Sequence, residues 1–184
     1  AGPLATPTID VEAGRVYTLG VDGELRCWQT RPPGKLLWRK NLYEAYRIRR
    51  RPSVGGGVRD FGTTASPLLL GENVIVEVGR SAGVLAALNK ATGQEAWSAE
   101  DTGPAGHTCG PRPFRAGDRS AVALLSLDRL LLISTEAPKP GATLAAAKWA
   151  TNFGCNIPTP AVSGDRIVVT SAYNRKRTTC FRFQ

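Results

Sequence analysis

The stretch Ala86–Trp97, AALNKATGQEAW, joins a short apolar segment to a turn and then to a tryptophan four residues beyond Gly93. Residues 34–38, GKLLW, repeat this glycine-to-tryptophan spacing, and residues 147–149, AKW, keep the tryptophan. Self-similarity along a chain indicates a repeat architecture. The sequence therefore predicts several copies of one small structural unit.

A proline marks the start of each unit. Pro7, Pro67 and Pro160 follow Thr or Ser, and Arg112-Pro113-Phe114 is a weaker copy, so the prolines are 60, 46 and 47 residues apart. A glycine turn and an aliphatic run follow, as in residues 71–76 and 164–169. Short β-branched runs between Gly, Pro, Asn and Asp are typical of strands. Each unit is therefore predicted to contain four short antiparallel strands.

A four-stranded unit of about 45 residues cannot bury both of its faces alone, so such units stack radially as blades of a β-propeller. The fold class we expect is all-β, with a β-sandwich as the alternative. The expected blades are residues 4–42, 64–98, 107–151 and 157–184, with a basic insertion at 43–62. Residues 1–184 then form one partial propeller of about three and a half blades, whose last blade lacks its outer strand.

The chain contains no methionine and begins Ala1-Gly2-Pro3, without a signal-peptide pattern or a run of ~18 apolar residues. Its 42% hydrophobic and 21% charged residues are typical of a globular domain. We expect an excised or mature segment. The remaining blades of a longer chain, or a second copy, are its expected structural partners.

Tryptophan rings on outer strands are suited to cover a neighbouring blade while each N–H finds an acceptor. We expect this blade-docking role for Trp38, Trp97 and Trp149, together with the turn glycines Gly34 and Gly93.

The stretch Ala86–Trp97 resembles the tryptophan-docking motif, Ala-x-Asp-x-x-Thr-Gly-x-x-x-Trp, of pyrroloquinoline quinone (PQQ)-like propeller repeats, with Asn89 where the family has Asp. The chain is most similar to the non-enzymatic bacterial members related to the propeller lipoprotein of the outer-membrane barrel-assembly machinery. This resemblance implies a fold of the quinoprotein dehydrogenase-like superfamily. It also implies a non-catalytic scaffold in the periplasm or another extracytoplasmic compartment, which binds a protein or another ligand.

The alternative function is part of a PQQ-dependent oxidoreductase whose cofactor site lies in blades outside this segment. The resemblance implies that such enzymes use the quinone with Ca²⁺, an aspartate base and a disulfide between adjacent cysteines. The four cysteines here are 82, 46 and 25 residues apart, so we expect no bound quinone. His107 is the only histidine and there is no Cys-x-x-Cys pair, so no metal site is expected. No sequence context supports a nucleophile–base pair of His107 and Cys109.

The cysteines fall into two groups. Cys27 and Cys180 occupy the same repeat position as Ala87, which predicts a small buried slot facing the next blade. Cys109 and Cys155 each precede an inner strand in consecutive units, which makes them a candidate disulfide. Such a bond would suit an oxidising compartment.

The net charge of +9 is concentrated in one part of the chain. Residues 26–59 contain 10 basic residues against the single Glu44, and the remaining charges cancel. The centre of this stretch contains Arg47, Arg49, Arg50 and Arg51 beside Tyr46. A long arginine-bearing loop is suited to bind an anionic partner, either a protein or an acidic polymer. The alternative is a solvated loop. The cluster is too short to predict a groove for nucleic acid.

Overall fold

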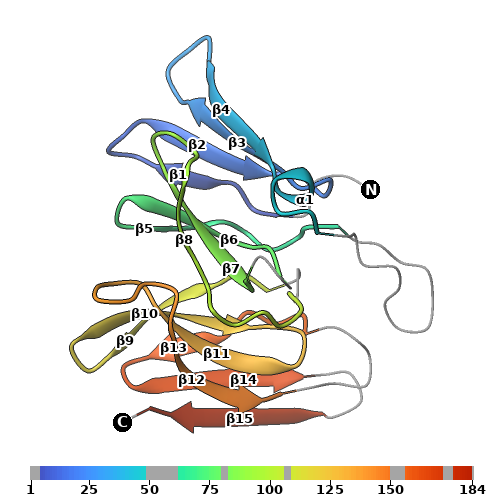
Figure 1. Ribbon diagram of the computed structural model, residues 1–184, viewed down its shortest axis with the longest axis vertical. Helices are drawn as coiled ribbons and strands as arrows, with labels where there is room; N and C mark the ends of the chain where they lie inside the picture. Colours follow the sequence, from blue (N-terminus) through green and yellow to red (C-terminus); the bar gives the residue numbers. More distant parts are fainter. Residues whose placement is uncertain are drawn as a thin grey trace.

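The computed structural model describes residues 5–48, 62–79, 83–105, 109–149, 156–171 and 176–183. Four antiparallel sheets stack in chain order, from the blue first sheet to the red fourth (Figure 1). The first three have four strands each in sequential order, and the fourth has three strands in the described part of the chain. The expected all-β fold with propeller-type blades is confirmed.

Each sheet lies within one of the expected blade ranges. The first contains β1 (Thr8–Asp10), β2 (Arg15–Leu19), β3 (Glu24–Gln29) and β4 (Leu36–Asn41). The second contains β5 (Leu68–Leu70), β6 (Asn73–Glu77), β7 (Leu85–Asn89) and β8 (Glu95–Ser98). The third contains β9 (Arg112–Ala116), β10 (Arg119–Leu125), β11 (Arg129–Ser134) and β12 (Thr143–Lys148). The fourth contains β13 (Ala161–Ser163), β14 (Arg166–Ser171) and β15 (Arg177–Arg182).

A short helix, α1 (Leu42–Ala45), follows β4 and was not expected from the sequence pattern. Asn41 caps it, because its side-chain oxygen accepts a hydrogen bond from the backbone N–H of Glu44 at 3.1 Å. No helix in the described ranges is long and apolar enough to cross a membrane.

Alternate side chains of the central strands face opposite neighbours, as the period of two in a strand requires. Val74 and Val76 of β6 pack with Tyr17 of the first blade. Ile75, between them, packs with Val122 of the third blade. A further apolar cluster joins the third and fourth blades. Each pair of adjacent blades therefore shares its own core.

The third blade differs from the expected repeat alignment at its inner strand. Strands β1, β5 and β13 begin directly after Pro7, Pro67 and Pro160, whereas β9 begins after Pro111. Gly110-Pro111-Arg112 is thus the third copy of the motif, and the assignment of Pro113 is wrong. The physical reason is the β9–β10 hairpin, which makes two more cross-strand pairs before its turn than the β5–β6 hairpin does.

The outer strand of the third blade requires the same kind of correction. Each of the first three blades has a register shift at the same place between its third and fourth strands. Cys27 pairs there with Trp38, Ala87 with Trp97, and Leu132 with Ala145. Ala145 therefore occupies the docking-tryptophan position. Trp149 lies four residues after Ala145, one residue beyond the end of β12.

Candidate functional site

The Thr/Ser-Pro motifs hold the inner strands of neighbouring blades together. The backbone N–H of Thr6 donates to Ser66 Oγ at 2.9 Å, and Thr8 Oγ1 donates to the Pro67 carbonyl at 2.6 Å. Between the third and fourth blades, the Gly110 N–H donates to Thr159 Oγ1 at 3.3 Å. In each case, a side-chain hydroxyl of one blade forms a hydrogen bond with a backbone group of another blade.

These same segments enclose a pocket of about 590 Å³, which we call the inner-strand pocket. Its volume lies within the range of small-ligand sites, about 300–1,000 Å³. All four blades contribute to its lining, which consists of Thr6, Thr8, Ile9, Thr64, Ser66, Pro67, Leu68, Leu69, Gly110, Pro111, Arg112 and Thr159. Arg112 is the only charged residue among them. We therefore take this pocket as the candidate binding site.

The pocket contains hydrogen-bond donors that are free to bind a ligand. A hydroxyl has one hydrogen and two acceptor lone pairs. Ser66 and Thr159 already accept backbone N–H groups, and no acceptor for their hydroxyl hydrogens occurs among the described residues. Arg112 is exposed and forms no ion pair within the described part of the chain. The pocket can thus donate hydrogen bonds to an acceptor-rich ligand.

The pocket does not fit the quinone that the enzyme branch of the superfamily binds. Its described lining has no aromatic side chain to stack on a planar ring system. It also has no carboxylate, whereas Ca²⁺ takes six to eight oxygen ligands, with Asp and Glu prominent among them. Elsewhere in the described ranges, no group of three or more His, Cys, Asp or Glu side chains is placed to hold a metal ion.

The predicted arginine-rich site lies largely outside the described residues, which include Arg47 but not Arg49, Arg50 or Arg51. Arg47 is exposed, with a φ of 50°. Tyr46 instead packs against the core of the first two blades. Burial of its hydroxyl and the nearby Glu95 raise the Tyr46 pKa. The Tyr46 side chain is therefore half-buried between the first two blades, and its place in a binding surface remains a prediction.

Two of the predicted blade-docking residues, Trp38 of the first blade and Gly93 of the second, lie together. Trp38 Nε1 donates to the carbonyl oxygen of Lys90 at 3.2 Å, and the Tyr17 hydroxyl donates to the same oxygen at 2.9 Å. A Cβ on Gly93 would lie 2.8 Å from the Trp38 ring, and the φ of Gly93 is +71°. The turn of the second blade therefore holds the tryptophan of the first. Burial raises the pKa of Tyr17 to about 12.

The other predicted docking residues have different surroundings. Trp97 is half-buried and packs on the cluster shared by the second and third blades. Gly34 occupies a left-handed turn with a φ of +72°, where a Cβ would meet only the Gln29 carbonyl oxygen within 4 Å. Trp149 is buried against the fourth blade, where Phe181 makes an edge contact and the Arg177 guanidinium lies 5.6 Å from the ring centroid.

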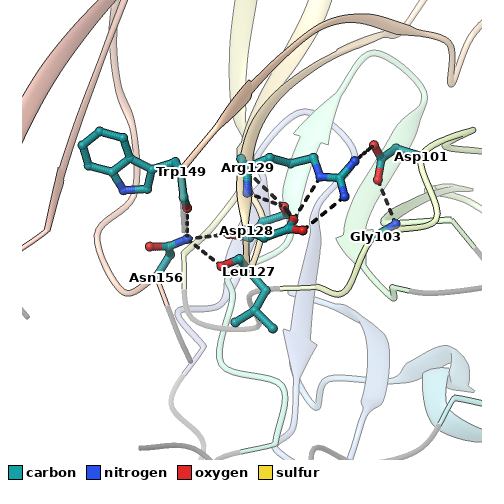
Figure 2. A network of polar contacts seen from close by, with 8 residues as sticks. Asp101, Gly103, Leu127, Asp128, Arg129, Trp149 and Asn156 are labelled. Atoms are coloured by element: carbon teal, nitrogen blue, oxygen red, sulfur yellow. Dashed lines mark hydrogen bonds and ion pairs between the residues drawn. The ribbon is translucent and has the colours of Figure 1, made fainter. Parts of the chain in front are cut away.

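A polar network that the sequence did not predict lies beside Trp149 (Figure 2). The buried Asn156 donates through Nδ2 to the carbonyls of Ser126, Leu127 and Trp149 at 2.8–3.0 Å. On the other side of the network, the Arg129 guanidinium donates hydrogen bonds to the carboxylates of Asp128 and Asp101.

The hydrogen bond from Arg129 is the main reason why the pKa of Asp128 is lowered. In the sequence, the only sign of this network is that the oppositely charged Asp128 and Arg129 are adjacent.

The cysteines show how neighbouring blades determine burial. Cys27 and Cys180 occupy equivalent positions, opposite Tyr17 and Val168, as expected. Cys27 is buried, but Cys180 is exposed because no described blade covers its face of the fourth sheet. Cys109 is buried, and its Sγ donates to the Leu125 carbonyl at 2.8 Å. Its candidate disulfide partner, Cys155, lies outside the described residues, as does His107.

Comparison with known proteins identifies the fold. A family model described as outer membrane protein assembly factor BamB matches residues 3–182. BamB from Moraxella catarrhalis is similar in structure, with a TM-score of 0.63 and 16% identity over 97% of this chain and 46% of that one. The chain therefore spans less than half of that protein. No curated protein sequence matches it significantly.

Two further solved structures share the fold. The computationally designed Ika4 protein has a TM-score of 0.58 and 11% identity, and the match covers 98% of this chain and 92% of that one. A europium-containing methanol dehydrogenase has a TM-score of 0.54 and 14% identity, with coverage of 80% and 25%. At such low identity these similarities establish the fold alone.

Proposed function

Because the chain belongs to the PQQ-like propeller family of the outer membrane protein assembly factor BamB, we propose that it is a non-catalytic, extracytoplasmic scaffold that binds another protein. The family description names a factor for the assembly of outer membrane proteins, and a factor that assembles proteins must contact them. The proposal places the binding surface where the inner strands of all four blades begin.

The observation that carries this proposal is the inner-strand pocket. Pockets that combine apolar walls with a few convergent polar groups are the usual places for ligand recognition. Pro67, Leu68 and Leu69 supply the apolar wall, and Arg112 adds one charge. The hydrogen bonds between motifs hold these groups in place before a partner binds.

The oxidoreductase alternative has less support. The similarity to a methanol dehydrogenase extends over 25% of that enzyme and indicates a shared fold. We propose that the segment works without bound quinone, because the lining of its pocket suits neither the planar ring nor Ca²⁺. The Arg-rich insertion remains a second predicted binding element for an anionic partner.

Site-specific photo-crosslinking tests the scaffold function. A photoreactive residue replaces Thr64 in the pocket, and a control replaces Asp118 at the exposed hairpin turn at the far end of β9. We expect irradiation in extracts of the source organism to give a discrete protein adduct from position 64, which excess unlabelled chain suppresses. Identical adducts from both positions, or none from position 64, would contradict the proposal.

A further inference from the structure

We propose that the inner-strand pocket recognises the C-terminal carboxylate of a polypeptide whose last residue is aliphatic. This inference rests on the proposed scaffold function and specifies the chemistry of the partner segment. It follows from three properties of the pocket: the charge of Arg112, which no described carboxylate neutralises, the lack of acidic residues in the described lining, and the apolar wall.

Arg112 is the first of these properties. It is the first residue of β9 and lines the pocket, and no described carboxylate lies within ion-pair distance of it. Thr8, Leu68 and Ala161 occupy the equivalent position in the other blades, so the repeat does not require a charge there. A guanidinium can bind a carboxylate through two parallel hydrogen bonds.

The lack of acidic residues in the described lining decides the sign of the ligand's charge. The described lining contains no Asp or Glu, and the hydroxyls of Ser66 and Thr159, which accept hydrogen bonds from backbone N–H groups, keep their own hydrogens for a ligand. A cation would find no counter-ion in this pocket. A carboxylate accepts up to four hydrogen bonds and so matches the donors available.

The apolar wall decides which carboxylate fits. Ile9 is 59% exposed at the pocket, and Leu68 and Leu69 lie beside it. A free C-terminal residue carries its carboxylate and its side chain on the same carbon atom, so an aliphatic side chain can contact this wall while the carboxylate reaches Arg112.

The test titrates the ¹⁵N-labelled 184-residue chain with N-acetyl-glycyl-leucine and with its C-terminal amide, following the amide signals of Ser66 and Gly110 by NMR. We expect amidation to weaken binding about tenfold or more, because it removes a charge-assisted pair of hydrogen bonds. Arg112→Gln should weaken binding of the free acid by a similar factor, and Arg112→Lys by less. Arg115→Gln, at an exposed position of the same strand outside the pocket, should leave it unchanged.

Equal affinity for the acid and the amide would overturn the inference, and so would equal losses in Arg112→Gln and Arg115→Gln. Tight binding of PQQ with displacement of the peptide would overturn it in favour of the quinone. The comparison of acid with amide needs no variant, so a variant that fails to fold does not remove the test. If position 64 gives a crosslinked protein but the acid and the amide bind equally, the scaffold function stands and the carboxylate inference fails. If the pocket prefers the acid but position 64 gives no crosslinked protein, the carboxylate inference stands and the scaffold function fails.

Discussion

The contact between Trp38 and Gly93 should behave as one energetic unit between the first two blades. Trp38→Ala removes a half-buried ring from the shared core together with its hydrogen bond to the Lys90 carbonyl. Gly93→Ala adds a methyl group at a φ of +71°, 2.8 Å from two atoms of that ring. The second change therefore includes a clash that exists only while the ring is present.

The magnitudes follow from these contacts. Truncation of a buried aromatic residue costs about 3–5 kcal/mol, and half-burial places Trp38→Ala near the lower value, about 3 kcal/mol. Gly93→Ala costs ~1–2 kcal/mol for the left-handed backbone alone. The overlap with the ring adds about 1–3 kcal/mol, as overpacking does. Loss of the Trp38 hydrogen bond alone, in Trp38→Phe, should cost about 1 kcal/mol.

Equilibrium urea unfolding of the two single variants and the double variant, followed by circular dichroism, measures the coupling. We expect Gly93→Ala to cost at least about 1 kcal/mol less in the Trp38→Ala background than in the native chain, because contacting residues are not additive. Gly71→Ala is the control, since Gly71 has a φ of +56° and no atom within 4 Å of an added Cβ. Its cost should be the same in both backgrounds.

Additivity of Trp38→Ala and Gly93→Ala within about 0.3 kcal/mol would refute the reasoning, because independent sites add to that precision. It would mean that the Gly93 turn does not hold the tryptophan in solution. A coupling of the same size between Trp38 and Gly71 would also refute it.

Three further outcomes are expected. Gly110→Ser should stabilise the chain by about 0.5–1.5 kcal/mol, because its Cβ would lie 3.7 Å from the Ser66 backbone nitrogen and its hydroxyl could restore the missing link of the inner-strand motif. Asn156→Leu should destabilise by about 3 kcal/mol or more, since three carbonyls lose their donor. Asp128 has a lowered pKa, so its pairing with Arg129 stabilises the fold above the unfolded pKa and is lost as pH falls through the folded value. Asp128→Asn should therefore be less stable at neutral pH, with the difference closing in acid.

Thermal unfolding at several pH values measures all three. A Gly71→Ser control should lower the melting temperature, because that position has space but a left-handed backbone. The first expectation fails if Gly110→Ser lowers the melting temperature, and the second fails if Asn156→Leu leaves it unchanged. The third fails if the difference in melting temperature between Asp128→Asn and the native chain widens in acid.

The strands and the main docking motif were predictable because they depend on local patterns. Aliphatic residues alternate or run between glycine turns, as in Val74-Ile75-Val76 after Gly71, and the extended backbone then places them on two faces. Spacing alone did not show that Gly93 contacts the tryptophan of the preceding blade. The network of Asn156 was also not predictable, because its acceptors are backbone carbonyls, which carry no sequence signal.

The sequence by itself determined the all-β repeat and the family, because strand alternation and turn chemistry act over a few residues. Only the tertiary structure decided the register of the third blade. The spacing of the sequence placed Pro113 and Trp149 at the repeat positions, whereas the strand pairing places Pro111 and Ala145 there. The tertiary structure also decided the pocket, whose walls come from positions as distant as 6 and 159. Such positions meet only when whole blades pack together, and that packing depends on the summed burial of many side chains rather than on any local pattern.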